Sequence, residues 1–203
     1  SNLRGFQAVF CSWAIIVGSF ALAALYPSVW SVAIALVLLG GRHLALAILM
    51  HDASHYSLFR TRWLNDVVGA WLGAYPTWQD LKRYRGHHWN HHMQAGSEKD
   101  PDWDLVSPFP VSRASLVRKL LRDISGLSGL KRVYGQWLMD TGQIEYTVSS
   151  KMVRIPQEGK SAWDVTKILF KNIRGVFLTN VAMFSILFFC GYPWVYGLWV
   201  VSY

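Results

Sequence analysis

Two long stretches of this 203-residue chain contain no Asp, Glu, Lys or Arg, namely residues 5–41 and residues 175–203. A helix needs about 20 predominantly apolar residues to cross the hydrocarbon core of a bilayer, so the first stretch is long enough for nearly two spans. Pro27 lies near its middle, and a helix interior tolerates proline poorly. The stretch therefore predicts a transmembrane helical hairpin with spans at residues 6–25 and 29–49.

The second charge-free stretch repeats this design. An apolar run from Val176 to Cys190 is followed by Pro193, which comes directly after a tyrosine just as Pro27 does. It predicts a second hairpin over residues 175–203, whose last span is incomplete. Because the chain has neither an initiator Met nor a recognisable signal peptide, we interpret the sequence as a fragment of a longer protein.

Composition and charge agree with a membrane protein. The chain is 52% hydrophobic and only 16% charged, against about 25% charged residues in soluble domains, and no strand pattern is present. We therefore predict a single all-α integral membrane domain over residues 1–203. Nineteen of the 20 Lys and Arg residues lie between positions 42 and 174, which places the segment 50–174 on the cytoplasmic side. The net charge of +8 suits anionic lipid headgroups, and no nucleic-acid-binding motif is present.

Two parts of the central segment have patterns of their own. Residues 67–75 are apolar but too short to span, which indicates a re-entrant or interfacial helix; their Gly69 and Gly73 form a GxxxG that either permits close helix packing or occurs by chance. Residues 113–124 are amphipathic, with basic and apolar faces. This pattern favours a helix lying in the headgroup plane over an ordinary helix packed on a soluble core. Residues 140–164 are polar and are expected to form a connection.

Three residues with potential chemistry lie inside the predicted spans. Cys11 and Cys190 lack CxxC spacing, so we expect two small buried hydrophobic residues rather than a disulfide or a thiolate metal site. His43 should lie within the bilayer, where a hydrogen-bonded interior group is expected rather than a metal ligand.

Histidines are concentrated in "HDASH" (51–55) and "HHWNHH" (87–92). Side chains four apart on a helix project from nearly the same face, so each cluster can present two imidazoles to one point in space. Imidazole without thiolate suits Zn, Cu, Fe or Ni, and costly polar groups at a membrane edge are usually functional. The alternative is a set of histidines that are only hydrogen-bonded or form an interfacial patch. The clusters consist of His51 and His55, then His87, His88, His91 and His92.

Acidic residues flank both clusters. Asp52 follows His51, and "EKDPDWD" contains Asp100, Asp102 and Asp104. Such carboxylates either orient ligating histidines through hydrogen bonds or form a solvated acidic loop, and both interpretations stay open.

The two clusters, their order and their surroundings resemble the membrane-bound fatty acid desaturases, the histidine-box di-iron enzymes, over residues 40–203. The stretches "SLFRTRWLNDVVG", "YRGHHWNHHMQAGSEKDPD" and "PFPVSRASLVRKLLRD" are similar to the bacterial branch. The family's third box has no counterpart in this sequence. By this resemblance the metal ligands are His51 and His55 from the first box and His88, His91 and His92 from the second, with His87 as a possible addition.

The resemblance implies an oxidoreductase with two Fe ions and O₂ as co-substrate that introduces a double bond into an acyl chain. Its substrate would be an acyl-CoA, an acyl-carrier protein or a phospholipid, and its electron donor a ferredoxin, rubredoxin or cytochrome b5. No residue is expected to act in catalysis beyond the ligands. Because five imidazoles are too few for two irons, we expect activity from the full-length parent, in a bacterial inner membrane with cytoplasmic boxes, and not from this segment alone.

Two alternatives remain at the level of sequence. A hydroxylase or ketolase of the same superfamily would use the same boxes on alkanes, carotenoids or sphingolipids. A non-catalytic membrane protein could bind zinc or haem through the histidines, although haem would favour single histidines facing each other within the bilayer.

Overall fold

The computed structural model describes residues 1–149 and 151–203. These residues form helices and loops, with an isolated β-bridge between Ile144 and Arg154. The chain divides into two compact units, residues 1–85 with 174–203, and residues 86–173. The predicted all-α fold is confirmed for the part of the chain that the structure describes.

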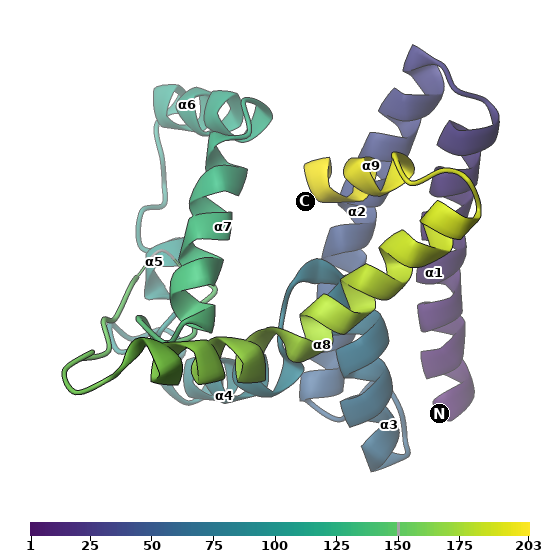
Figure 1. The fold of residues 1–203 in the computed structure, drawn as a ribbon. Helices are drawn as coiled ribbons and strands as arrows, with labels where there is room; N and C mark the ends of the chain where they lie inside the picture. The colour runs from purple at the N-terminus through teal and green to yellow at the C-terminus, as the bar shows by residue number, and fades with distance from the viewer. Residues whose placement is uncertain (150) are drawn as a thin grey trace. The chain divides into compact units, whose positions relative to one another are not determined.

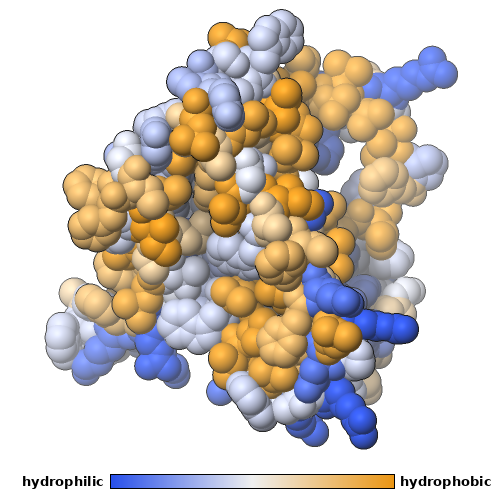
Figure 2. Space-filling model, turned by 90° about the vertical axis from the view of Figure 1, so that its right-hand side faces the viewer, coloured by the Kyte–Doolittle hydropathy of each residue, from blue (hydrophilic) through white to orange (hydrophobic). Residues whose placement is uncertain are grey.

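Among the described residues, three helices are long and apolar enough to cross a membrane: α1 (Asn2–Leu25), α2 (Val29–Ser54) and α8 (Ala162–Phe189). Helices α1 and α2 pack side by side as a hairpin (Figure 1). Large apolar side chains cover outward faces (Figure 2), and Phe10 of α1 is 73% exposed. Such an apolar exterior is expected of helices solvated by lipid, so the chain is a membrane protein.

The turn between α1 and α2 is built by serine. The side chain of Ser28 accepts a hydrogen bond from the backbone N–H of Ser31, and Ser31 Oγ accepts one from the N–H of Ser28. This reciprocal capping satisfies N–H groups that the first turn of a helix leaves without partners. It fixes the start of α2 directly after Pro27.

The segment after α2 changes its helical type before a proline. Helix α3 (Arg62–Val68) continues as the π-helical η1 (Gly69–Ala74) and the 3₁₀ turn η2 (Tyr75–Thr77). Pro76 has no N–H to donate to the carbonyl of Leu72. The indole Nε1 of Trp13 in α1 donates to that carbonyl oxygen at 3.0 Å. A π-helical stretch thus replaces the plain helix that the sequence indicated.

The GxxxG of this segment allows it to pack closely against α2. A Cβ on Gly69 would lie 2.3 Å from the Cβ of Ala53 in α2, and a Cβ on Gly73 would lie 3.3 Å from the backbone nitrogen of Met50. The backbones can approach this closely only because both residues lack a side chain. Chance occurrence is therefore the wrong interpretation of this motif.

Within the first unit, helix α9 (Val195–Val201) is held against α2 and the 62–77 segment by hydrogen bonds. Nε2 of His43 lies 3.0 Å from the carbonyl oxygen of Trp199, and the indole of Trp199 donates to the carbonyl oxygen of Pro76 at 3.1 Å. His43 is buried and bonded, which confirms its expected role as an interior group.

The expectation for the two cysteines is wrong. Both Cys11 and Cys190 are exposed on the surface of the structure rather than buried in it. On a bilayer-spanning helix an outward-facing small apolar side chain is solvated by acyl chains, so burial within the protein is not required for it.

The second unit contains most of α4 (Leu81–Gln94), then α5 (Trp103–Val106), α6 (Arg113–Ile124) and α7 (Leu127–Asp140). The amphipathic segment is helical as predicted, and Ser112 caps α6 by accepting from the N–H of Ser115. The apolar side chains of α6 are exposed, Ile124 by 83%. Residues 141–149 and 151–161 lie outside the helices and contain the isolated bridge.

Candidate metal centre

The first histidine cluster occupies the last turn of α2. His51 lies in the helix and His55 is its C-cap residue, so the two rings come from successive turns with centroids 4.7 Å apart. Nδ1 of His51 lies 3.1 Å from a carboxylate oxygen of Asp52. Because an ionised carboxylate only accepts, this hydrogen bond requires the proton on Nδ1.

Helix α2 ends here because the chain turns into the left-handed region at Tyr56, which has a φ of 57°. The N–H of Tyr56 donates to the carbonyl oxygen of Ala53, and the N–H of Ser57 donates to that of Asp52. These two bonds form a Schellman motif, a helix ending that normally uses glycine. A side chain in this conformation costs about 1–2 kcal/mol, so surrounding contacts must hold Tyr56 in place.

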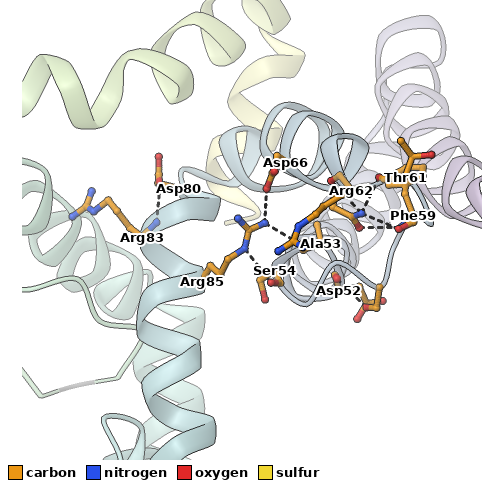
Figure 3. A network of polar contacts seen from close by, with 12 residues as sticks. Asp52, Ala53, Ser54, Phe59, Thr61, Arg62, Asp66, Asp80, Arg83 and Arg85 are labelled. Atoms are coloured by element: carbon orange, nitrogen blue, oxygen red, sulfur yellow. Dashed lines mark hydrogen bonds and ion pairs between the residues drawn. The ribbon is translucent and has the colours of Figure 1, made fainter.

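Two arginines contact this turn, and Figure 3 shows the hydrogen bonds of one of them, Arg85. Arg85 in α4 donates to the carbonyl oxygens of Ser54 at 3.0 Å and Ala53 at 3.2 Å, and to the carboxylate of Asp66 at 2.7 Å. Its guanidinium carbon also lies 4.2 Å from the ring centroid of Tyr56, and that of Arg62 lies 4.3 Å from the same centroid. The end of α2 is thus bonded to the start of α4.

The second histidine cluster lies on α4 in the second unit. Nε2 of His88 and Nε2 of His92 are 3.1 Å apart, so these two rings meet tip to tip. Imidazole nitrogens bind zinc at about 2.0–2.1 Å with tetrahedral angles, which puts two such nitrogens about 3.3–3.4 Å apart. The observed spacing is close to that of two ligands of one metal ion.

A hydrogen-bonded acidic pair holds the other two histidines of α4. Nδ1 of His91 lies 2.8 Å from Asp100, and Nε2 of His87 lies 2.8 Å from Asp102. Burial of Asp100 opposes its ionisation, but hydrogen bonds from His91 and the N–H of Asp102 outweigh burial and lower the pKa of this carboxyl. His91 therefore donates through Nδ1 and keeps Nε2 for a ligand role. Nε2 of His87 is occupied by Asp102.

The flanking acids thus behave differently from one another. Asp52, Asp100 and Asp102 each contact a histidine ring, as the orienting interpretation requires. Asp104 is exposed in α5, as a solvated acidic loop would predict.

Comparison with known proteins decides the family. The family model described as "Fatty acid desaturase" matches residues 27–203. The chain belongs to the fatty acid desaturase family. Among curated proteins it is similar to dihydrorhizobitoxine desaturase from Bradyrhizobium elkanii, at 36% identity over 89 residues, or 43% of this chain. The match spans 25% of that relative's length, and no solved structure matches the chain significantly.

Membership of the desaturase family agrees with the chemistry of the donor set. Each box presents paired imidazoles one helical turn apart, and no cysteine accompanies them. Nitrogen donors of this kind suit iron among the transition metals. The residues therefore fit the metal group that a desaturase uses.

Sequence reasoning missed the residues that hold the boxes. Arg85 and Tyr56 are ordinary in sequence, and their roles depend on contacts across 31 positions of the chain. Asn65 is also unremarkable in sequence, yet it is fully buried and bonds both backbone groups of Phe59. One local signal for these contacts exists in the sequence. Tyr56 directly follows the first histidine box, and the helix ends there although no glycine is present.

Proposed function

We propose that the full-length protein is a membrane-bound di-iron fatty acyl desaturase that uses O₂ to introduce a double bond into an acyl chain. The observation that carries this proposal is the tip-to-tip pair of imidazoles at His88 and His92 in a chain of the desaturase family. His88 is buried and His92 is exposed, and paired imidazoles without thiolate suit iron among the transition metals.

The proposed ligands are His51 and His55 from the first box and His88, His91 and His92 from the second. When bound, the di-iron group supplies the O₂ activation that removal of hydrogen from a saturated carbon chain requires. Both boxes would serve one centre. Support for this comes from Arg85, which bonds the end of α2 and lies one helical turn before His88 in α4.

The acidic residues would set which nitrogen each ring presents. Asp52 holds Nδ1 of His51 and Asp100 holds Nδ1 of His91, so in both rings Nε2 remains for the metal. The proposed ligand set leaves out His87: its Nε2 donates to Asp102, so unlike His51 and His91 it could offer a metal only Nδ1. Its task would be to hold Asp102 against α4.

The partners follow from the same proposal. The substrate would be the acyl chain of an acyl-CoA, an acyl-carrier protein or a phospholipid, and electrons would come from a ferredoxin, rubredoxin or cytochrome b5. The boxes would face the cytoplasm of a bacterial inner membrane, because the Lys and Arg residues gather between positions 42 and 174. Aqueous labelling of single cysteines placed beside Pro27 and beside Asn90 in intact cells tests this orientation.

Product analysis tests the activity. We would express the full-length protein with a supply of saturated acyl lipid and examine the lipids by mass spectrometry. A product that has lost two hydrogen atoms is expected, whereas a product that has gained one oxygen atom would establish a hydroxylase instead. His88→Ala should abolish the product and exposed Asn90→Ala, two residues along the same helix, should keep it. Equal activity of both variants would contradict the proposed ligand set.

A further inference from the structure

We propose that Arg85 is a positioning residue for the first histidine box: its guanidinium fixes the last turn of α2 and so sets the approach of His51 and His55 to the metal. This inference rests on the proposed function, since it concerns ligands of the same centre. It adds a residue outside the histidine boxes that neither the family match nor the motifs identify.

Arg85 donates to two of the last carbonyl oxygens of α2, and that of Ala53 also accepts the N–H of Tyr56. The carbonyl oxygens at the end of an α-helix lack intrahelical partners, and they carry the negative end of the helix dipole. Arg85 donates Nε–H to the oxygen of Ser54 and an Nη–H to that of Ala53. Ser54 lies directly before His55, so these bonds hold the backbone on which the box is built.

The same guanidinium also holds the turn after the box. Tyr56 adopts a left-handed conformation that a tyrosine rarely takes, and the guanidinium groups of Arg85 and Arg62 both lie within 4.3 Å of its ring centroid. Contact between a guanidinium and an aromatic face is attractive. Loss of Arg85 would therefore release both the last carbonyls of α2 and the residue that terminates the helix.

The arrangement requires arginine rather than a positive charge alone. Three N–H groups of one planar fork reach two carbonyls and the carboxylate of Asp66 while the plane stacks on Tyr56. A lysine ammonium is a compact point charge that cannot make these contacts together. The ion pair between Arg85 and Asp66 contributes less than the bonds to the carbonyl oxygens, because Asp66 is half exposed and exposed ion pairs are weak in water.

Hydrogen exchange on metal-free full-length protein tests the structural step. The amides of His55, Tyr56 and Ser57 are bonded within the turn, and we expect them to exchange at least about tenfold faster in Arg85→Ala and in Arg85→Lys. Lys82→Ala is the matched control, because Lys82 is an exposed cation on the same helix. Peptides from α1 should be unchanged in all variants, which distinguishes local release from general unfolding.

Metal titration tests the link to the centre, with Co²⁺ as the probe metal and visible absorption as the signal. Arg85→Ala and Arg85→Lys should weaken Co²⁺ binding by about 10–100-fold, the usual effect of removing a group that orients a ligand, and Lys82→Ala should not. Faster exchange with unchanged affinity, or unchanged exchange, would overturn the role of Arg85. Failure of the wild-type protein to bind metal would instead contradict the proposed function, while the exchange result would still stand on its own.

Discussion

Outside the histidine boxes, substitution of Asn65 should clearly lower the free energy of unfolding. Its fully buried amide accepts from the N–H of Phe59 and donates to the carbonyl oxygens of Phe59 and Thr61. Asn65→Ala leaves buried backbone groups without partners, and we expect the free energy of unfolding to fall by about 1–3 kcal/mol. Denaturant unfolding in detergent micelles measures it, and exposed Asn90→Ala should change stability by less than about 0.5 kcal/mol.

His87 and His88 are neighbours that should respond differently to substitution. His87→Gln keeps a donor for Asp102, so iron should stay bound at the wild-type stoichiometry. His88→Ala removes one of two nitrogens that meet at 3.1 Å and should lose metal. Elemental analysis of the two purified variants makes the comparison. Loss of iron from His87→Gln to the same extent as from His88→Ala would make His87 a ligand.

At the scale of elements, the contact between α2 and the 62–77 segment depends on Gly69. An alanine Cβ there would lie 2.3 Å from the Cβ of Ala53, so the two elements must separate. We expect Gly69→Ala to destabilise the protein by about 1–3 kcal/mol, although alanine is the better helix former. Gly129→Ala in α7 meets nothing within 4 Å and should stabilise by about 0.5–1 kcal/mol. Thermal unfolding of both variants measures the difference, and equal shifts would contradict this packing.

Helix α6 has an exposed apolar face and a basic face, and we predict that it lies in the lipid headgroup plane. The test uses fluorescent labels at Leu120→Cys and Arg118→Cys in a Cys11→Ser, Cys190→Ser background, in proteoliposomes of full-length protein. Brominated lipid should quench the label at position 120, and aqueous iodide the label at 118. If iodide quenches both labels, both faces of the helix are in water. If neither brominated lipid nor iodide quenches the label at position 120, protein covers the apolar face.

The elements also show where sequence patterns stop being informative. The amphipathic period of residues 113–124 predicts α6, because that pattern depends only on neighbours along the chain. The π-helical stretch before Pro76 was not predicted, since the group that compensates for the missing N–H is Trp13, far away in α1. Exposure of Cys11 was missed for a related reason, as the composition of a span does not reveal which of its faces meets lipid.

For the whole molecule, charge and hydrophobicity were sufficient to predict an all-α membrane protein, whereas the desaturase family was predicted from the resemblance of the two histidine boxes and the sequences around them to that family. Spacing gives the pairs His51/His55 and His88/His92 because four residues are about one helical turn. It does not give the residues that orient them. Asp100 was a candidate because it follows the second box, but Arg85 acts on the carbonyls of α2 through the folded chain, and the histidine spacing does not point to it.

The central claim is that histidines of both boxes bind one iron centre in the full-length protein. Iron-edge X-ray absorption combined with elemental analysis tests it most directly, on wild type and on His51→Ala and His88→Ala. We expect about two irons per chain in a shell dominated by imidazole nitrogen, with an iron neighbour, and loss of that neighbour in each variant. Zinc in place of iron, or a variant in either box that leaves the metal content and the iron neighbour intact, would contradict the account.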